Sequence, residues 1–368
     1  MTITEPQARP GHPLPPAAEA PALSPEQAAD RLMQIWTEMG TGLLLALADR
    51  TSLLETLAER GPSTSAELAQ AAGLQERYVR EVLDGLFVSR LLSLDTRTRR
   101  YAVPEEFVPV LTSAGGPDNM VRLMRYAELA TVLDKVEQAA RHGGGTSYAD
   151  YAHFQELQAE DSGAVFEATL LDQVVPLVPD LPERLEGIEV VDLGCGRGRA
   201  VTLLAEAYPQ SRFTGMDFSA EAVQFAQADA AARGLANAEF RLQDVARWDE
   251  PGRYDLVTAF DAIHDQADPA AVLRAARQAL RSGGTFLMVD IAGSSQPEGN
   301  LELPWAPMLY AVSVLHCMAV SLGQDGLGLG TMWGRQQALQ MLAEAGFRHI
   351  DPIDVEEDPF NTYYVARP

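Results

Sequence analysis

The sequence has few positive charges for its length. Its 368 residues include 28 Lys+Arg against 52 Asp+Glu, which gives a formal net charge of −24. A polyanionic duplex or an anionic membrane repels such a chain, and little cationic surface is left to release counterions. We therefore expect neither a nucleic acid nor a membrane as a partner.

Cysteine and long apolar runs are also scarce. The two cysteines, Cys195 and Cys317, are far apart and have no Cys or His partner at zinc-ligand spacing. A disulfide framework and a metal site are therefore not expected. No uninterrupted apolar run approaches the ~20 residues that span a bilayer, and no signal-peptide pattern is present at the start. These absences predict a cytoplasmic protein, and the 46% of hydrophobic residues is enough for globular cores.

The chain divides into four segments by composition and periodicity. Residues 1–24 are rich in Pro and Ala and have almost nothing to bury, which predicts a disordered tail. Residues 25–115 begin with a capped helix and continue as helices and a hairpin, the pattern of a winged helix. A helical connector is expected over 116–182, and alternating strand and helix patterns over 183–368 predict a parallel sheet covered by helices.

The N-terminal domain is predicted to serve assembly rather than DNA binding. Its second helix-turn-helix segment, Gln75–Ser89, carries Arg77 and Arg80 against three acids. DNA recognition needs cationic donors to phosphates and base edges, whereas the acids leave this segment with a net charge of −1. An apolar stripe from Leu32 to Leu47 has too many large residues to remain in water, and it predicts a symmetric homodimer.

A glycine-rich turn follows the first strand expected in the C-terminal domain. Strands are predicted at 189–193, 212–217, 239–242, 256–260, 285–291, 349–353 and 362–366. After Asp192 the first strand runs into Gly194, Gly196 and Gly198, and glycines there bring a ligand close to the next helix N-terminus. Arg199 stands where a nicotinamide fingerprint needs its third glycine, so this turn is of another kind.

Acids and an aromatic residue occupy the next strand ends. Asp217 closes the second strand, where a carboxylate can accept both hydroxyls of a ribose. Asp244 and Val245 follow the third strand, suited to an exocyclic amine and a purine face, and Phe260 ends the fourth. Each residue alone also has a structural explanation, such as a helix cap or core packing. The glycine turn, Asp217, Asp244 and Phe260 each follow or end one of four successive strands, and such an arrangement is improbable by chance.

These segments resemble the successive motifs of class I S-adenosylmethionine-dependent methyltransferases. The matching segments are Asp192–Gly198, Gly215–Ser219, Asp244–Val245, Tyr254–Val257 and Leu280–Gly284. The resemblance implies an α/β fold, a Rossmann-like seven-stranded sheet that ends in an antiparallel hairpin. With its winged-helix domain the chain is similar to dimeric small-molecule O-methyltransferases and to actinobacterial winged-helix methyltransferases.

The resemblance also implies S-adenosyl-L-methionine as the cofactor. The three glycines at 194, 196 and 198 would hold its methionyl part, Asp217 its ribose, and Asp244 with Val245 its adenine. Asp192, Phe218 and Phe260 complete the set of expected cofactor residues.

His264 is the candidate general base, within Asp261–Gln266. Methyl transfer is an in-line displacement, so the protein must align the acceptor and, for a hydroxyl, remove its proton. Imidazole has a suitable pKa, and plant-type O-methyltransferases place their catalytic histidine in a similar His-Asp context. Gln266 departs from that family, which has Trp there. Asp290 resembles the acid that orients the base, and a structural histidine remains the alternative.

Residues 292–334 form an insertion that is too long for an ordinary connection, and we expect it to be a lid over the acceptor. Its helical stretch Trp305–Leu322 is apolar and few charges converge there, which favours a largely apolar or aromatic acceptor. Candidate wall residues are Tyr151 and Phe154 of the connector and Tyr310, His316, Cys317, Met332 and Trp333 of the insertion. Core packing is the alternative for each.

The sequence therefore predicts methyl transfer to a hydroxyl or thiol of a small molecule. One alternative is a C- or N-methyltransferase that uses the same cofactor site without a catalytic base. Another is a ligand-sensing winged-helix regulator, which the acidic recognition helix disfavours. The acceptor itself is not identified by these residues.

Overall fold

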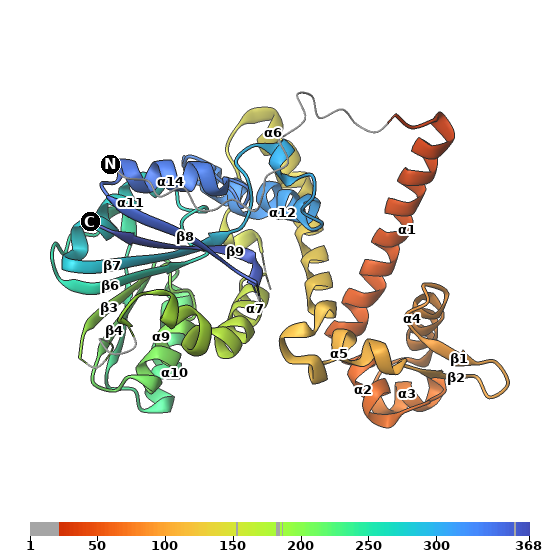
Figure 1. Ribbon diagram of the computed structural model, residues 1–368. Coiled ribbons are helices and arrows are strands. Elements are labelled where there is room, and N and C mark those ends of the chain that lie inside the picture. Colours follow the sequence, from red (N-terminus) through yellow and green to blue (C-terminus); the bar gives the residue numbers. More distant parts are fainter. Residues whose placement is uncertain (1–21, 152–153, 182–184, 186, 357) are drawn as a thin grey trace. The chain divides into compact units, whose positions relative to one another are not determined.

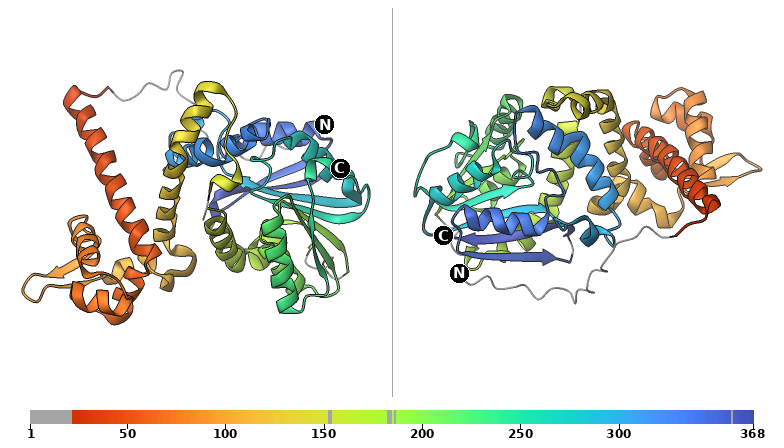
Figure 2. Two further views of the ribbon diagram at one scale, coloured as in Figure 1. Left: turned by 180° about the vertical axis from the view of Figure 1, so that it is seen from behind. Right: turned by 90° about the horizontal axis from the view of Figure 1, so that it is seen from above.

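The computed structural model describes residues 22–151, 154–181, 185, 187–356 and 358–368. Two compact units, Glu19–Glu128 and Leu129–Pro368, make up this part of the chain (Figures 1 and 2). The tail expected at residues 1–24 lies outside the described residues except for its last three.

The N-terminal unit is the predicted winged helix. Its elements are α1 (Pro25–Arg50), α2 (Leu53–Arg60), α3 (Ser65–Ala72), α4 (Glu76–Val88), β1 (Ser93–Asp95), β2 (Arg100–Ala102) and α5 (Val108–Leu111). Ser24 and Gln27 form a capping box at the start of α1, as their spacing predicts. The core consists mainly of leucines and valines from α2, α3 and α4, together with Tyr101 of the hairpin.

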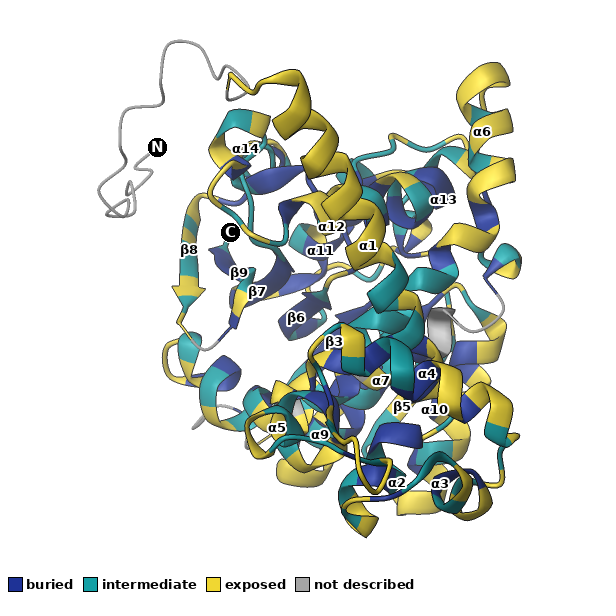
Figure 3. Ribbon diagram, turned by 90° about the vertical axis from the view of Figure 1, so that its right-hand side faces the viewer, coloured by how far each residue is buried: buried dark blue, intermediate teal, exposed yellow. Residues whose placement is uncertain are grey.

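Most of α1 lies outside this core. Leu45, Ala46 and Ala48 near its C-terminal end are buried, while the rest of the helix is largely exposed (Figure 3). Its exposed large apolar side chains are Leu32, Met33, Ile35, Trp36, Met39, Leu43 and Leu47. The stripe expected from the sequence is therefore available for a partner.

Helices lead from the winged helix to the sheet. They are the 3₁₀ helices Glu105–Phe107, Ser113–Asp118 and Met120–Val132, α6 (Leu133–His142), the 3₁₀ turn Tyr148–Asp150, α7 (Phe154–Thr169), the π-helix Leu170–Val174 and the 3₁₀ turn Val175–Leu177.

The second unit contains the predicted seven-stranded sheet. Its strands are β3 (Glu189–Leu193), β4 (Arg212–Asp217), β5 (Ala238–Leu242), β6 (Tyr254–Phe260), β7 (Leu280–Ile291), β8 (His349–Val355) and β9 (Asp358–Arg367). The strand order is β5-β4-β3-β6-β7-β9-β8, and β9 pairs antiparallel with both neighbours. The Rossmann-like sheet with its terminal hairpin is confirmed.

Two helical layers cover this sheet. Helices α9 (Arg199–Ala207) and α10 (Ala220–Arg233) lie on one face, and α11 (Pro269–Ala279) and α14 (Gly334–Glu344) lie on the other (Figure 1). Along β7 the side chains alternate between the two cores: Phe286 and Met288 pack with α11 and α14, whereas Leu287 and Val289 pack with α9 and α10. Successive side chains of a strand point to opposite faces of the sheet, so a strand that is covered on both faces needs apolar residues at consecutive positions.

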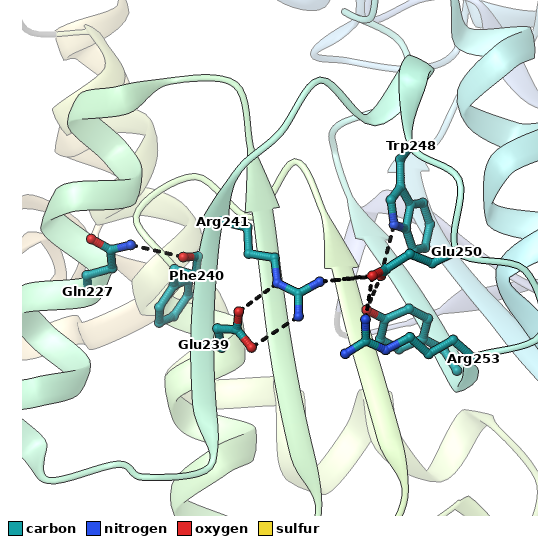
Figure 4. A network of polar contacts seen from close by, with 8 residues as sticks. Gln227, Glu239, Phe240, Arg241, Trp248, Glu250 and Arg253 are labelled. Atoms are coloured by element: carbon teal, nitrogen blue, oxygen red, sulfur yellow. Dashed lines mark hydrogen bonds and ion pairs between the residues drawn. The ribbon is translucent and has the colours of Figure 1, made fainter.

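A polar network braces the segment between β5 and β6 (Figure 4). Glu250 accepts hydrogen bonds from Trp248 Nε1 at 3.2 Å and from the Tyr254 hydroxyl at 2.8 Å. The same carboxylate forms ion pairs with Arg241 of β5 and with Arg253. The loop that leaves the carboxyl end of β5 is thereby tied to the start of β6.

The insertion after β7 is largely helical. It comprises the 3₁₀ turn Pro297–Asn300, α12 (Ala306–Val312), the π-helix Ser313–Cys317 and α13 (Met318–Gly323). In the described chain, the stretch Ala306–Gly323 is long and apolar enough to cross a membrane, and 44% of it is buried inside the protein. A core helix of a globular domain has the same length and composition, so this stretch does not identify a membrane segment.

Candidate active site

The glycine turn after β3 opens at Gly196. This residue has φ +52, and a Cβ placed on it would meet no atom within 4 Å. At Gly194 a Cβ would lie 2.5 Å from the Ala262 Cβ, and at Gly198 it would lie 2.4 Å from the Phe240 ring. Gly194 and Gly198 are therefore required by packing, whereas Gly196 faces open space that a ligand can enter. The sequence spacing does not distinguish these roles.

Asp217 joins the end of β4 to this turn. Its Oδ2 accepts the Gly196 N–H at 2.9 Å, and its Oδ1 accepts the Ser219 N–H at 2.8 Å. Burial raises the pKa of Asp217, although these backbone donors favour the charged form. The next residue, Phe218, is 41% exposed, and its ring centroid lies 5.2 Å from that of Tyr148.

Asp192 is buried at the end of β3. The Thr258 hydroxyl of β6 donates to its Oδ1 at 2.6 Å. Burial raises the pKa of Asp192 to about 7, and the negative charge of Asp217 adds to this. Asp192 thus links the end of β3 to β6, and direct contact with a cofactor stays a prediction.

The remaining expected cofactor residues have structural roles in the described chain. Asp244 caps the 3₁₀ turn Val245–Arg247 by accepting the Ala246 N–H at 3.1 Å. Val245 is buried in the core on the α11 face. The Phe260 ring packs edge-on against Phe166, with centroids 5.0 Å apart. Cofactor contacts of these three residues stay predictions.

His264 and Asp290 form a buried pair. His264 Nδ1 lies 2.8 Å from Asp290 Oδ1, and the two residues are 4% and 1% exposed. Burial alone lowers the pKa of His264, but the adjacent Asp290 carboxylate more than offsets this and raises it well above its ordinary value. Since Asp290 accepts at Nδ1, the neutral imidazole carries its proton there and leaves Nε2 as the acceptor.

Further acids surround this pair. The Tyr148 hydroxyl donates to Asp265 Oδ2 at 2.7 Å. Asp261, with φ +49, is accessible to solvent, yet the surrounding protein, with a further contribution from Asp290, raises its pKa to about 7. Neither Tyr148 nor Asp265 was among the predicted site residues. Two features of the sequence mark them: Tyr148 lies close to the connector aromatics Tyr151 and Phe154, and Asp265 follows His264 directly.

The structure packs several predicted wall residues into the interior. His316 is 1% exposed, and its ring contacts Tyr151 at 4.7 Å between centroids. Burial lowers the pKa of His316 to about 3, so its imidazole is neutral. The Tyr151 hydroxyl donates to the Leu315 carbonyl at 2.6 Å, and the buried Cys317 Sγ lies 3.5 Å from His316 Nδ1.

The other wall candidates lie in different surroundings. Tyr310 is 38% exposed, and its hydroxyl accepts from Asn300 Nδ2 at 3.2 Å. Met332 is 8% exposed, and Trp333 is 3% exposed with its indole N–H on Asp290 Oδ1 at 2.9 Å. Phe154 begins α7, but its side chain lies outside what the structure describes.

Helix α13 and the segment after it also contact the turn that carries His264. Ser321 Oγ donates to the Gln266 carbonyl at 2.9 Å. The Leu327 N–H donates to the Ala267 carbonyl at 3.0 Å, and the Gly330 N–H donates to the His264 carbonyl at 3.1 Å. The insertion, which we expect to be a lid, therefore also forms hydrogen bonds with the backbone of the turn that carries His264.

An open hollow of about 840 Å³ lies at the opposite edge of the sheet, where β3, β4 and β5 begin. Ligands of open α/β sheets bind at the carboxyl ends of the strands, where the glycine turn, Asp217 and His264 are found. The candidate active site is therefore at the carboxyl edge.

Two known domain families match the chain. Residues 185–346 match the family described as Methyltransferase domain, and residues 39–113 match the Rv2258c-like winged HTH domain. A ubiquinone biosynthesis O-methyltransferase from Leptothrix cholodnii is 29% identical over 150 residues, which are 39% of this chain and 62% of the relative. A trans-aconitate 2-methyltransferase from an Azoarcus species is 32% identical over 124 residues, or 33% of this chain and 47% of the relative. These matches span less than two thirds of either relative.

Solved structures share the fold over almost the whole chain. The mitomycin 7-O-methyltransferase MmcR superposes with a TM-score of 0.71 at 20% identity, covering 93% of this chain and 98% of that one. Human N-acetylserotonin methyltransferase, solved in complex with SAM, gives a TM-score of 0.69 at 19% identity, covering 94% and 99%. The resemblance seen in the sequence motifs is confirmed. The chain carries an Rv2258c-like winged helix-turn-helix domain at residues 39–113, followed in the sequence by a methyltransferase domain at residues 185–346.

Proposed function

We propose that this protein is an S-adenosylmethionine-dependent O-methyltransferase that acts on a small molecule. The observation that carries the proposal is the buried pair of His264 Nδ1 and Asp290 Oδ1, 2.8 Å apart. It lies at the carboxyl edge of the sheet, where β3 also ends in its glycine turn. Similarity to methyltransferases in sequence and to O-methyltransferases in fold supports the same activity.

The carboxyl edge fits S-adenosylmethionine. Open space at Gly196 admits the methionyl part, and the Asp217 carboxylate beside it suits the ribose hydroxyls. When bound, the cofactor supplies an electrophilic methyl group on its sulfonium.

His264 would remove the proton of the acceptor hydroxyl at Nε2. Asp290 keeps the imidazole oriented through Nδ1 and stabilises the imidazolium that forms. A C- or N-methyltransferase without a base remains the second candidate within the enzyme class. The buried histidine-carboxylate pair favours the hydroxyl acceptor, because a reaction without a base gives such a pair no role.

The charges around the pair restrict the acceptor. Among the described residues, Asp265 accepts from the Tyr148 hydroxyl and Asp290 from His264 and Trp333, and neither acid forms an ion pair with Lys or Arg. An anionic acceptor would have to approach these groups in a site of low dielectric. We therefore infer a neutral or cationic acceptor with a largely apolar or aromatic body.

The winged helix is proposed as an assembly module of a cytoplasmic homodimer rather than a DNA reader. On α4, Arg77 pairs with Glu81 and Arg80 with Glu76, so the arginines of the recognition helix face acids. The exposed apolar stripe of α1 is the proposed dimer surface. A ligand-sensing regulator would instead need free cationic groups on this helix.

The proposal is tested by measuring S-adenosylhomocysteine release with a panel of neutral, amino-substituted and carboxylated phenols. Turnover of neutral or amino phenols, lost in His264→Gln, is the expected result. Calorimetry with S-adenosylhomocysteine checks cofactor binding separately. Tight salt-dependent DNA binding without turnover of any acceptor would replace the enzyme by the regulator.

A further inference from the structure

The buried Trp333 contacts Asp290, the acid of the proposed catalytic pair, and is not exposed as a wall of the acceptor site. Its indole Nε1–H donates to Asp290 Oδ1 at 2.9 Å, and the two residues are 3% and 1% exposed. The same oxygen also accepts hydrogen bonds from His264 Nδ1 at 2.8 Å and from the Ile291 N–H at 2.9 Å. Asp290 Oδ2 is buried and has no hydrogen-bond partner among the described residues. All of the described hydrogen bonds to this carboxylate therefore meet at one oxygen.

The backbone holds Trp333 firmly at this place. Its N–H donates to the Gly330 carbonyl at 3.2 Å, and its own carbonyl accepts from Ser295 Oγ at 2.6 Å. Two residues further on, the Arg335 N–H donates to the Gly293 carbonyl at 2.9 Å. Trp333 thus links the end of the insertion to the segment that follows β7, the strand that carries Asp290.

We propose that Trp333 is a positioning residue of the methyl transfer, whose indole N–H holds Asp290 in the orientation that in turn orients His264. The inference rests on the proposed function of the pair. A donor on Asp290 Oδ1 fixes the rotation of the carboxylate and takes up part of its negative charge. The imidazole then keeps one orientation and is a weaker base than it would be beside an unshared carboxylate.

The groups that face His264 come from several elements. Asp290 lies on β7, Cys317 on the π-helix Ser313–Cys317, and Asp265 and Asp261 on the turn of His264 itself. The charge of His264 also acts on His316 and contributes to lowering the pKa of His316. Since Trp333→Phe leaves all of these groups in place, its effect on His264 isolates the indole N–H.

The insertion provides a matched control. Trp305 also belongs to it, and its buried Nε1 has no hydrogen-bond partner among the described residues. Its ring packs against Phe360, with centroids 4.6 Å apart. Trp305→Phe therefore removes the same atoms as Trp333→Phe without removing a described hydrogen bond.

The test is a pH titration of the full-length protein labelled with ¹⁵N-histidine, followed by NMR. His264→Gln assigns the His264 signals. In Trp333→Phe we expect the His264 midpoint to rise by about 0.5–1 pH unit, a three- to ten-fold change in its proton affinity. The midpoint should stay unchanged in Trp305→Phe. Equal midpoints in the wild type and Trp333→Phe would overturn the proposal.

A second measurement covers the case in which Trp333→Phe does not fold. In protein labelled with ¹⁵N-tryptophan, Asp290→Asn should speed exchange of the Trp333 indole proton about ten-fold and leave that of Trp305 unchanged. Unchanged exchange at Trp333 would contradict the link. Neither measurement uses an acceptor, so a protein that methylates nothing fails the proposed function and still reports on the positioning by Trp333.

Discussion

The carboxyl group of Asp192 is expected to lower the free energy of unfolding as the pH rises. Asp192→Asn should remove this contribution to the pH dependence of stability. The carboxyl group is 5% exposed, and burial raises its pKa from 3.8 to about 7. Between these values the folded chain keeps a proton that the unfolded chain has released. The stabilisation is complete below pH 3.8 and is lost as the pH rises to about 7.

The size of the effect follows from the gap between the two pKa values. About three pKa units at 1.36 kcal/mol each amount to about 4 kcal/mol. Asparagine has the shape of the protonated carboxyl and can still accept from the Thr258 hydroxyl. We expect Asp192→Asn to exceed the wild type in free energy of unfolding by about 4 kcal/mol at pH 8 and by about 1.5 kcal/mol at pH 5.

Urea unfolding followed by tryptophan fluorescence measures this difference. Three of the four tryptophans, Trp248, Trp305 and Trp333, lie in the unit that contains Asp192, and the fourth, Trp36, is exposed on α1, so a change in the signal reports mainly on the sheet domain. Asp244→Asn is the control, because Asp244 is half-exposed and keeps its capping oxygen in the variant. A stability gain of Asp192→Asn that is equal at pH 5 and pH 8 would refute the reasoning.

Three further outcomes are expected. His264→Gln should lower turnover by about 10²–10⁴ while S-adenosylhomocysteine affinity stays unchanged by calorimetry, and because its pKa is raised, wild-type turnover should increase with pH beyond 6.5. Asp217→Ala should weaken S-adenosylhomocysteine binding about ten- to hundred-fold, since it removes a charged acceptor, and an unchanged affinity would reject the ribose assignment. Ile35→Glu with Met39→Glu on the exposed stripe of α1 should give monomers by light scattering, whereas Thr37→Glu on the same helix should not; a wild-type monomer would remove the dimer surface.

Local patterns in the sequence determine the sheet domain. Short apolar runs bounded by glycines and helical segments predicted β3 and β4 with the same bounds as the structure and the other strands to within a few residues. The glycine turn and Asp217 come together because β3 and β4 are parallel neighbours, so their carboxyl ends meet at one edge. This much follows from periodicity and chain order alone.

The environment of each site residue was decided by the tertiary structure. The sequence placed Trp333 in an acceptor wall, whereas the fold brings its N–H to Asp290, 43 residues away in the chain. It likewise brings Tyr148 to Asp265 across 117 residues. Contacts of this range depend on how the insertion and the connector pack on the sheet, which no local pattern encodes. The family motifs could therefore point to His264 and Asp290 as candidates, but only the packed structure shows that Trp333 hydrogen-bonds to Asp290.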